Sequence, residues 1–186
     1  MRKLITFNMM SLDGFFEGPG GELDWHHVDG EFNEFALEQI GTADTLLFGR
    51  KTYELMAGYW PTPEAATDDP AVASIMNSYP KIVFSETLDK ADWNNTRLVK
   101  EPVAEAVTRL KQQPGKDMLL LGSAFLSSTL MQHRLIDEFR VMINPVVLGK
   151  GNPLFLPAQD KLELQLLKVK VFNSGNVLLF YQPVRK

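Results

Sequence analysis

Cysteine is absent from this chain of 186 residues, and that absence excludes disulfide frameworks, thiolate zinc sites and cysteine nucleophiles. It also fits a reducing compartment. No spacing of His or carboxylate residues is typical of a metal site, so we predict no bound metal. No apolar run approaches the length that crosses a bilayer, and no cleavage site follows the first apolar stretch. We therefore expect a mature first strand, no membrane contact and a cytoplasmic protein.

Positive charge is also scarce, because 19 Lys and Arg residues stand against 23 Asp and Glu residues, for a net charge of -4 at pH 7. The two signs are interspersed. Binding to a phosphate backbone needs a basic field, so we expect no nucleic-acid partner. The hydrophobic fraction of 45% is enough to bury one substantial core. Since no repeat or linker divides the chain, we predict a single domain over residues 1–186.

Short apolar runs alternate with helical patterns through the first two thirds of the chain. Helical spacing follows Asp29, Pro70, Pro102 and Ser123, whereas the stretch Pro61–Pro70 has the composition of a surface loop. Strands are expected at Leu4–Met10, Thr45–Phe48, Lys81–Phe84, Met118–Leu121, Glu138–Ile143, Leu162–Phe172 and Asn176–Gln182. The alternation predicts an α/β fold with a largely parallel sheet, and the turn at Asn173–Asn176 predicts an antiparallel final hairpin.

Two strand ends have residues that suit an anion. Gly122–Ser123–Ala124 follows the strand Met118–Leu121 and opens a helix, which offers backbone amides and little steric bulk. Gly49–Tyr53 follows the strand Thr45–Phe48 and includes two cations and a hydroxyl. A tight packing turn and a solvated cationic turn are the plainer readings of the two segments. Together they indicate a pyrophosphate and a further phosphate, because ligands of open α/β sheets collect at this edge.

The chain also resembles the dihydrofolate reductase superfamily, and more closely the branch with the reductase domain of the riboflavin-biosynthesis deaminase-reductase. The matching stretches are MSLDGFFEG at Met10–Gly18, LLFGRKTYE at Leu46–Glu54, KIVFSETL at Lys81–Leu88, LLLGSAFLSSTLM at Leu119–Met131 and DEFRVMINPVVLGKGNPLF at Asp137–Phe155. The resemblance implies a dihydrofolate reductase-like three-layer fold, in which helices flank a central mixed, mostly parallel sheet. It also implies a homodimer.

The resemblance implies NADPH as the cofactor and assigns residues to it by position. Gly49, Arg50, Lys51 and Thr52 match the segment that reaches the cofactor phosphates, with Arg50 favoured for the 2′-phosphate. Ser85 matches a residue near the adenosine end, and Gly122, Ser123, Ala124 and Phe125 match the turn that holds the pyrophosphate. Family members often have two glycines where this chain has Gly122–Ser123. Gly149 and Gly151 match a loop beside the nicotinamide, although glycines there also suit a tight bend.

Fewer residues match at the substrate end. Met9, Ser11 and Trp25 are expected to border the substrate, and Asp13 is the candidate catalytic residue, although Asp13–Gly14 also reads as a simple turn. The family's carboxylate on the first helix has no clear match, since Asp29 suits a helix cap and Glu31 and Glu34 suit its solvated face.

The sequence therefore predicts an NADPH-dependent oxidoreductase that transfers hydride to a small heterocycle, pterin-like or ribosylaminopyrimidine-like. The alternatives are a noncatalytic nucleotide- or ligand-binding protein that retains the reductase fold, and a dimerisation module built on the apolar final strands. Titration with NADPH and NADH tests whether a cofactor binds, and a screen of pterins, flavin precursors and quinones for NADPH oxidation then separates an enzyme from a binder.

Overall fold

A computed structural model describes residues 1–156 and 160–184 of the protein. In this part of the chain, eight strands form one sheet in the order β5-β4-β3-β6-β1-β7-β10-β9. The first six strands in this order are parallel, and β10 is antiparallel to both β7 and β9. The strands are β1 (Leu4–Ser11), β3 (Ala43–Gly49), β4 (Lys81–Phe84), β5 (Thr96–Val99), β6 (Asp117–Leu121), β7 (Glu138–Asn144), β9 (Leu164–Val171) and β10 (Val177–Pro183). The predicted mixed sheet with its final hairpin is thus confirmed.

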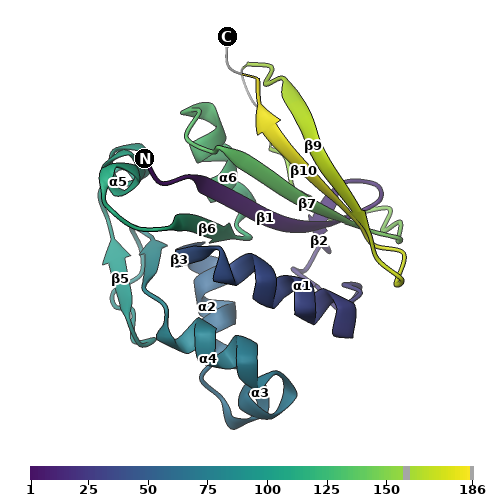
Figure 1. The fold of residues 1–186 in the computed structure, drawn as a ribbon, viewed down its shortest axis with the longest axis horizontal. Helices are drawn as coiled ribbons and strands as arrows, with labels where there is room; N and C mark the ends of the chain where they lie inside the picture. Colours follow the sequence, from purple (N-terminus) through teal and green to yellow (C-terminus); the bar gives the residue numbers. More distant parts are fainter. Residues whose placement is uncertain (157–159, 185–186) are drawn as a thin grey trace.

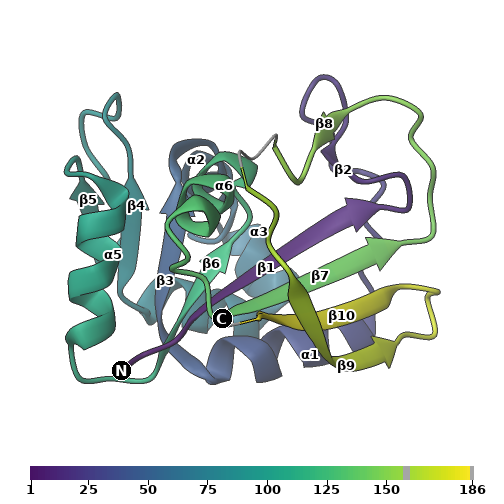
Figure 2. The same cartoon turned by 90° about the horizontal axis from the view of Figure 1, so that it is seen from above.

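Helices cover both faces of this sheet and complete the three layers (Figure 1). One face packs against α1 (Gly30–Gly41), α2 (Arg50–Tyr59) and α4 (Pro70–Ser78), and the other against α5 (Val103–Gln112) and α6 (Ala124–Gln132). Figure 2 shows α5 and α6 in front of the sheet and α1 behind it. Among the described helices, none is long and apolar enough to cross a membrane.

The prediction of a surface loop at Pro61–Pro70 is wrong. The short helix α3 occupies Pro63–Asp68, and α4 starts at Pro70. Thr62 Oγ1 accepts a hydrogen bond from Ala65 N at 3.2 Å, and Asp69 Oδ1 accepts one from Val72 N at 3.0 Å. Each capping residue is followed by a proline, whose fixed φ suits the first helical position. The Pro, Thr and Asp residues of this stretch therefore form the N-terminal ends of two consecutive helices.

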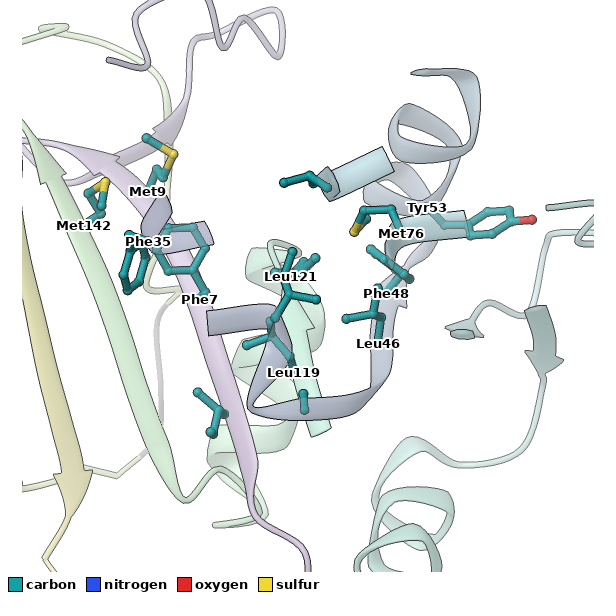
Figure 3. Close-up of a cluster of buried hydrophobic side chains, with 14 of the residues drawn as sticks. Phe7, Met9, Phe35, Leu46, Phe48, Tyr53, Met76, Leu119, Leu121 and Met142 are labelled. Atoms are coloured by element: carbon teal, nitrogen blue, oxygen red, sulfur yellow. The ribbon is translucent and has the colours of Figure 1, made fainter. Parts of the chain in front are cut away.

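The larger hydrophobic core lies between the sheet and the layer formed by α1, α2 and α4. Alternation along β1 sends Phe7 and Met9 to this side, where Figure 3 shows the Phe7 ring facing Phe35 of α1. The two ring centroids are 5.8 Å apart. The labelled side chains of β3 and β6, Leu46, Phe48, Leu119 and Leu121, extend the same core toward α2 and α4 (Figure 3). This packing fixes where the strands end, and so positions the candidate site.

Two short strands that the sequence did not predict form a separate small sheet. β2 (Phe15–Glu17) pairs with β8 (Asn152–Pro153) in an antiparallel arrangement. Their pairing brings the segment after β1 against the segment after β7. Position 151 must be glycine for this contact, because a Cβ there would lie 2.4 Å from the Glu17 carbonyl oxygen.

Candidate functional site

The junction between β3 and α2 contains the predicted cofactor residues Gly49 to Thr52. α2 begins at Arg50, and no side chain caps its N-terminus. The first amides of a helix have no intrahelical acceptor, so they remain available to an anion. A side chain at position 49 has no room, because a Cβ there would lie 2.2 Å from Ser123 Oγ. Gly49 therefore lets this helix start lie directly against a second strand end.

That second strand end is the junction between β6 and α6. Gly122 and Ser123 have φ values of 62° and 59°, so both lie in the left-handed region. For a serine this conformation costs on the order of 1 kcal/mol. Ser123 Oγ accepts a hydrogen bond from Leu126 N at 3.3 Å and caps α6. The amides of Ala124 and Phe125 lie in the first turn of α6 and have no intrahelical acceptor.

These two junctions meet because β3 and β6 are adjacent parallel strands. Leu46 pairs with Leu119, so both strands end at the same edge of the sheet. The Thr52 side chain lies against the turn, since a Cβ at Gly122 would be 3.2 Å from Thr52 Oγ1. The N-terminal ends of α2, which has no capping side chain, and α6, which is capped by Ser123, thus converge from opposite faces of the sheet on one place. Backbone amides at helix N-termini bind phosphate groups, so this place suits a pyrophosphate.

Arg50 extends the site to the loop after β4. Arg50 Nη1 donates to Thr87 Oγ1 at 2.7 Å, and Arg50 Nε donates to Glu54 Oε1 at 2.9 Å. The Arg50 side chain is 47% exposed, so its guanidinium remains accessible. Ser85 Oγ accepts from the amides of Thr87 and Leu88. Thr87 thus connects the two predicted cofactor residues, because its hydroxyl accepts from Arg50 and its amide donates to Ser85.

Sequence reasoning missed Thr87, although its position two residues after Ser85 is typical of a hydroxyl turn. The other predicted cofactor residues in this region differ in exposure. Lys51 is exposed on the first turn of α2, and Phe125 is 75% exposed on the first turn of α6. Phe125 is a large apolar side chain left in solvent beside the anion-competent turn.

Asp13, the predicted catalytic residue, lies at the end of β1 and contacts the loop after β7. Its carboxylate accepts hydrogen bonds from Ser11 Oγ at 2.6 Å, Gly149 N at 2.8 Å and Leu148 N at 3.1 Å. The Ser11 hydroxyl, followed by these amides, holds the pKa of Asp13 below its usual range. An ionised carboxylate with three donors is suited to anchoring the loop, and it is poorly suited to donating a proton. A catalytic role for Asp13 stays a prediction.

The predicted glycines Gly149 and Gly151 therefore belong to the β1–β7 half of the edge, and Gly49 and Gly122 belong to the β3–β6 half. β1 lies beside β6 in the sheet, so the two halves are neighbours. Phe16 of β2 connects them, because a Cβ at Gly122 would lie 3.4 Å from its ring. Gly149 has a φ of 74°, which the tight bend of the loop requires.

The three predicted substrate residues lie at this same β1–β7 half. Met9 is buried in the core beside Met142, and the Ser11 side chain is buried with its hydroxyl bonded to Asp13. Trp25 donates from Nε1 to the Glu22 carbonyl at 3.0 Å, and its ring packs edge-on against His26. Trp25 thus stabilises its own loop, and a role in contacting substrate stays a prediction.

Two buried asparagines that the sequence analysis did not single out hold the Trp25 loop against the sheet. Asn144 Oδ1 accepts from His27 N at 2.9 Å, and Asn176 Nδ2 donates to the His27 carbonyl at 2.8 Å. Both asparagines are fully buried. Burial in the docked loop lowers the pKa of His26 to about 4. The role of Asn144 and Asn176 depends on a contact between segments that are distant in the sequence, so no local sequence pattern indicates it.

Within residues 1–156 and 160–184, the His, Asp and Glu side chains form no group of three that suits a metal ion. Two carboxylates near the predicted substrate end, Asp29 and Glu31, have structural roles. Asp29 Oδ1 accepts from Phe32 N at 2.9 Å and caps α1. Glu31 accepts from Asn173 N at 2.9 Å, so it ties α1 to the β9–β10 turn.

Comparison with known proteins adds sequence and fold relationships. The chain is similar to the uncharacterised protein YyaP of Bacillus subtilis, with 38% identity over 97% of this chain and 94% of YyaP. It resembles the structure of a Shewanella sp. PV-4 protein provisionally assigned to riboflavin biosynthesis, with a TM-score of 0.76, 25% identity and coverage of 98% and 99% of the two chains. Dihydrofolate reductase from Enterococcus faecalis, complexed with NADP(H), has the same fold, with a TM-score of 0.65, 15% identity and coverage of 97% and 96%.

The family model described as the RibD C-terminal domain matches residues 2–178, which is nearly the whole chain. This match agrees with the dihydrofolate reductase-like fold and with the order of the sequence motifs along the sheet edge. On these grounds the chain belongs to the RibD C-terminal domain family.

Proposed function

We propose that the protein is an NADPH-dependent reductase that transfers hydride to a C=N or C=O bond of a small heterocycle. One observation carries this proposal: the N-terminal ends of α2 and α6 meet at one edge of the sheet, with Gly49 directly against Ser123. Family membership and the riboflavin-biosynthesis relative support a reductase-like function. A pterin-like or ribosylaminopyrimidine-like ring is the substrate class that this likeness favours.

The donor set fits a phosphorylated dinucleotide. The amides of Ala124 and Phe125 suit the pyrophosphate, because they lie at the start of α6 without an intrahelical acceptor. Arg50, Ser85 and Thr87 suit a 2′-phosphate, since a guanidinium and two hydroxyls gather there within hydrogen-bonding contact. When bound, the nicotinamide supplies a hydride, and the chain's own part is to hold and orient it.

Asp13 and Glu31 favour a second candidate function, a noncatalytic ligand-binding protein. Both carboxylates accept hydrogen bonds from backbone amides, and the lowered pKa of Asp13 makes that residue a poor proton donor. A binder would show cofactor affinity without any NADPH oxidation across a screen of pterins, flavin precursors and quinones.

Titration of the protein with NADPH and NADH, followed by nicotinamide fluorescence, tests the cofactor. Replacing Arg50 with Ala should weaken NADPH about tenfold to a hundredfold and leave NADH nearly unchanged, because a charge-assisted hydrogen bond contributes roughly 1.5–3 kcal/mol. Arg109→Ala is the matched control, since Arg109 is an exposed arginine on α5 with its own ion pair to Glu101. An equal loss for both nucleotides contradicts the 2′-phosphate role, and no binding of either ends the proposal.

We also propose a homodimer formed through the β9–β10 hairpin. Val169 and Val171 alternate with Lys168 and Lys170, whose ammonium groups lie over aromatic rings on the α1 side. The valines therefore point to the opposite face, which α5 and α6 leave uncovered in Figure 2. They are 45% and 67% exposed on an edge strand, which is a surface that a second copy would bury. A reductase of this kind works where NADPH is regenerated, so we propose a cytoplasmic location.

A further inference from the structure

The first turn of α2 makes two contacts with the loop between β4 and β5, residues 85–95. Arg50 Nη1 donates to Thr87 Oγ1 at 2.7 Å, and Tyr53 Oη accepts from Trp93 N at 3.1 Å. Arg50 and Tyr53 are three residues apart, so their side chains leave the helix on the same side. The place proposed for the 2′-phosphate therefore lies between a helix and a loop that are joined at two points.

The two contacts differ in their surroundings. Arg50 and Thr87 are exposed, so water competes for the hydrogen bond between them. Tyr53 and Trp93 are buried, with 4% and 6% of their surface exposed. Without the Tyr53 hydroxyl, the buried amide of Trp93 would lose its acceptor, which is costly. The buried contact is therefore the one that fixes the loop against α2.

Trp93 is itself fixed within the core. Its indole Nε1 donates to Asn77 Oδ1 of α4 at 2.7 Å, and Lys81 Nζ of β4 lies 4.6 Å from the ring centroid. The ring centroids of Phe48 and Tyr53 are 6.0 Å and 6.1 Å from that of Trp93. The far end of the loop is thus held by β3, β4, α2 and α4 together.

The segment before Trp93 has few buried contacts of its own. Residues 85–92 belong to no helix or strand, and Leu88 and Ala91 are only partly buried against the core. A segment of this kind opens at a low free-energy cost unless its ends hold it. One end is the last residue of β4, and the other is Trp93. The two hydroxyls proposed for the 2′-phosphate lie between these ends.

We propose, on the basis of the reductase function above, that Tyr53 is a positioning residue for the discrimination between NADPH and NADH. Tyr53 holds Trp93, and Trp93 holds the loop so that Ser85 and Thr87 face Arg50. Donors from separate segments bind a phosphate well only when they are held in place beforehand. NADH has no 2′-phosphate, so its binding does not depend on this arrangement.

Tyr53→Phe tests the proposal, because it retains the ring and removes the acceptor of Trp93 N. NADPH and NADH are titrated into the folded wild-type and variant proteins by nicotinamide fluorescence. The Kd of NADPH should rise about fivefold to tenfold, and that of NADH should change by less than about twofold. Tyr59→Phe is the matched control on the same helix, since the Tyr59 hydroxyl donates to Asp68 Oδ2 at 3.0 Å, and it should change neither Kd. An equal loss for both nucleotides, or no loss for either, overturns the proposal.

A double variant separates positioning from a general loss of structure. In an Arg50→Ala background, Tyr53→Phe should weaken NADPH by only about twofold or less, because both changes act on the same phosphate. A loss that stays fivefold or more, at about the size seen with Arg50 present, overturns the positioning role.

Amide hydrogen exchange tests the anchoring without a cofactor. Residues 85–92 should exchange faster in Tyr53→Phe than in Tyr59→Phe or the wild type, and the amides of β3 and β6 should not. Unchanged exchange in residues 85–92 overturns the proposal. If exchange increases but the wild-type protein binds neither nucleotide, the reductase function fails, and the discrimination assigned to Tyr53 fails with it.

Discussion

Gly49 and Ser123 offer a direct test of whether the two phosphate-binding strand ends meet in solution. Gly49 has φ −81° and ψ 166°, so an alanine backbone is unstrained there. The added Cβ would lie 2.2 Å from Ser123 Oγ and 3.0 Å from Ser123 Cβ. Overpacking of this kind costs roughly 1–3 kcal/mol. We expect Gly49→Ala to destabilise the fold by about 2 kcal/mol.

Ser123→Gly should remove that cost. It deletes both clashing atoms, and the next neighbour, Leu126 Cβ at 3.7 Å, is an ordinary contact. By itself Ser123→Gly relieves the left-handed strain and loses the cap, so its own effect should stay within about 1 kcal/mol. The double variant should therefore recover about 1–2 kcal/mol relative to the sum of the single effects.

Urea denaturation measures this coupling through the shift of the midpoint at constant slope. Gly58→Ala is the matched control on the same helix, because a Cβ at Gly58 meets nothing within 4 Å. Gly58→Ala should stabilise by roughly 0.5–1 kcal/mol and show no coupling to position 123. Additivity of Gly49→Ala and Ser123→Gly within about 0.5 kcal/mol would refute the convergence of the two strand ends.

Three further expectations concern the Trp25 loop and the final hairpin. Burial lowers the pKa of His26 to about 4, so a proton binds the imidazole more strongly in the unfolded chain than in the folded one. The free energy of unfolding is therefore highest above pH 6.5 and decreases as the pH falls toward 4. Between pH 7 and pH 5 the loss should be about 2 kcal/mol in urea titrations, and His26→Phe should abolish it. Asn144→Ala leaves the His27 amide without its acceptor and should cost about 1–3 kcal/mol, seen as faster amide exchange in residues 18–28. Replacing Val169 and Val171 with Glu should convert a dimer to a monomer by light scattering, and an unchanged mass would exclude this interface.

Local patterns predicted the parts of the fold and site that depend on local chemistry. The parallel strands are continuous apolar runs, and Gly49–Thr52 and Gly122–Phe125 follow them directly, so their meeting follows from strand adjacency. The two helix starts at Thr62 and Asp69 were readable in the same way from their prolines. The loop interpretation gave more weight to the Pro, Thr and Asp content of Pro61–Pro70 than to the positions of Pro63 and Pro70 directly after Thr62 and Asp69.

Features that depend on distant contacts were beyond local patterns. β2 and β8 are three and two residues long, and each exists because the other lies beside it. Asn144 and Asn176 look like ordinary turn residues until the Trp25 loop docks on them. Asp13 was expected at the reaction centre, and its three hydrogen bonds are set by where the loop after β7 returns.

The position of β1 has a consequence for how the protein is made. Among the strands of the main sheet β1 is synthesised before the others, yet its two partners are β6, where Leu4 pairs with Met118, and β7, where Ile5 pairs with Glu138 (Figure 2). Both hydrogen-bonding edges of this apolar strand therefore stay unpaired until residues 117–144 have been synthesised. Such high contact order slows folding and exposes the nascent strand to aggregation. Chaperone binding to the N-terminal segment during translation is the expected result, and truncation before residue 144 should leave no stable sheet.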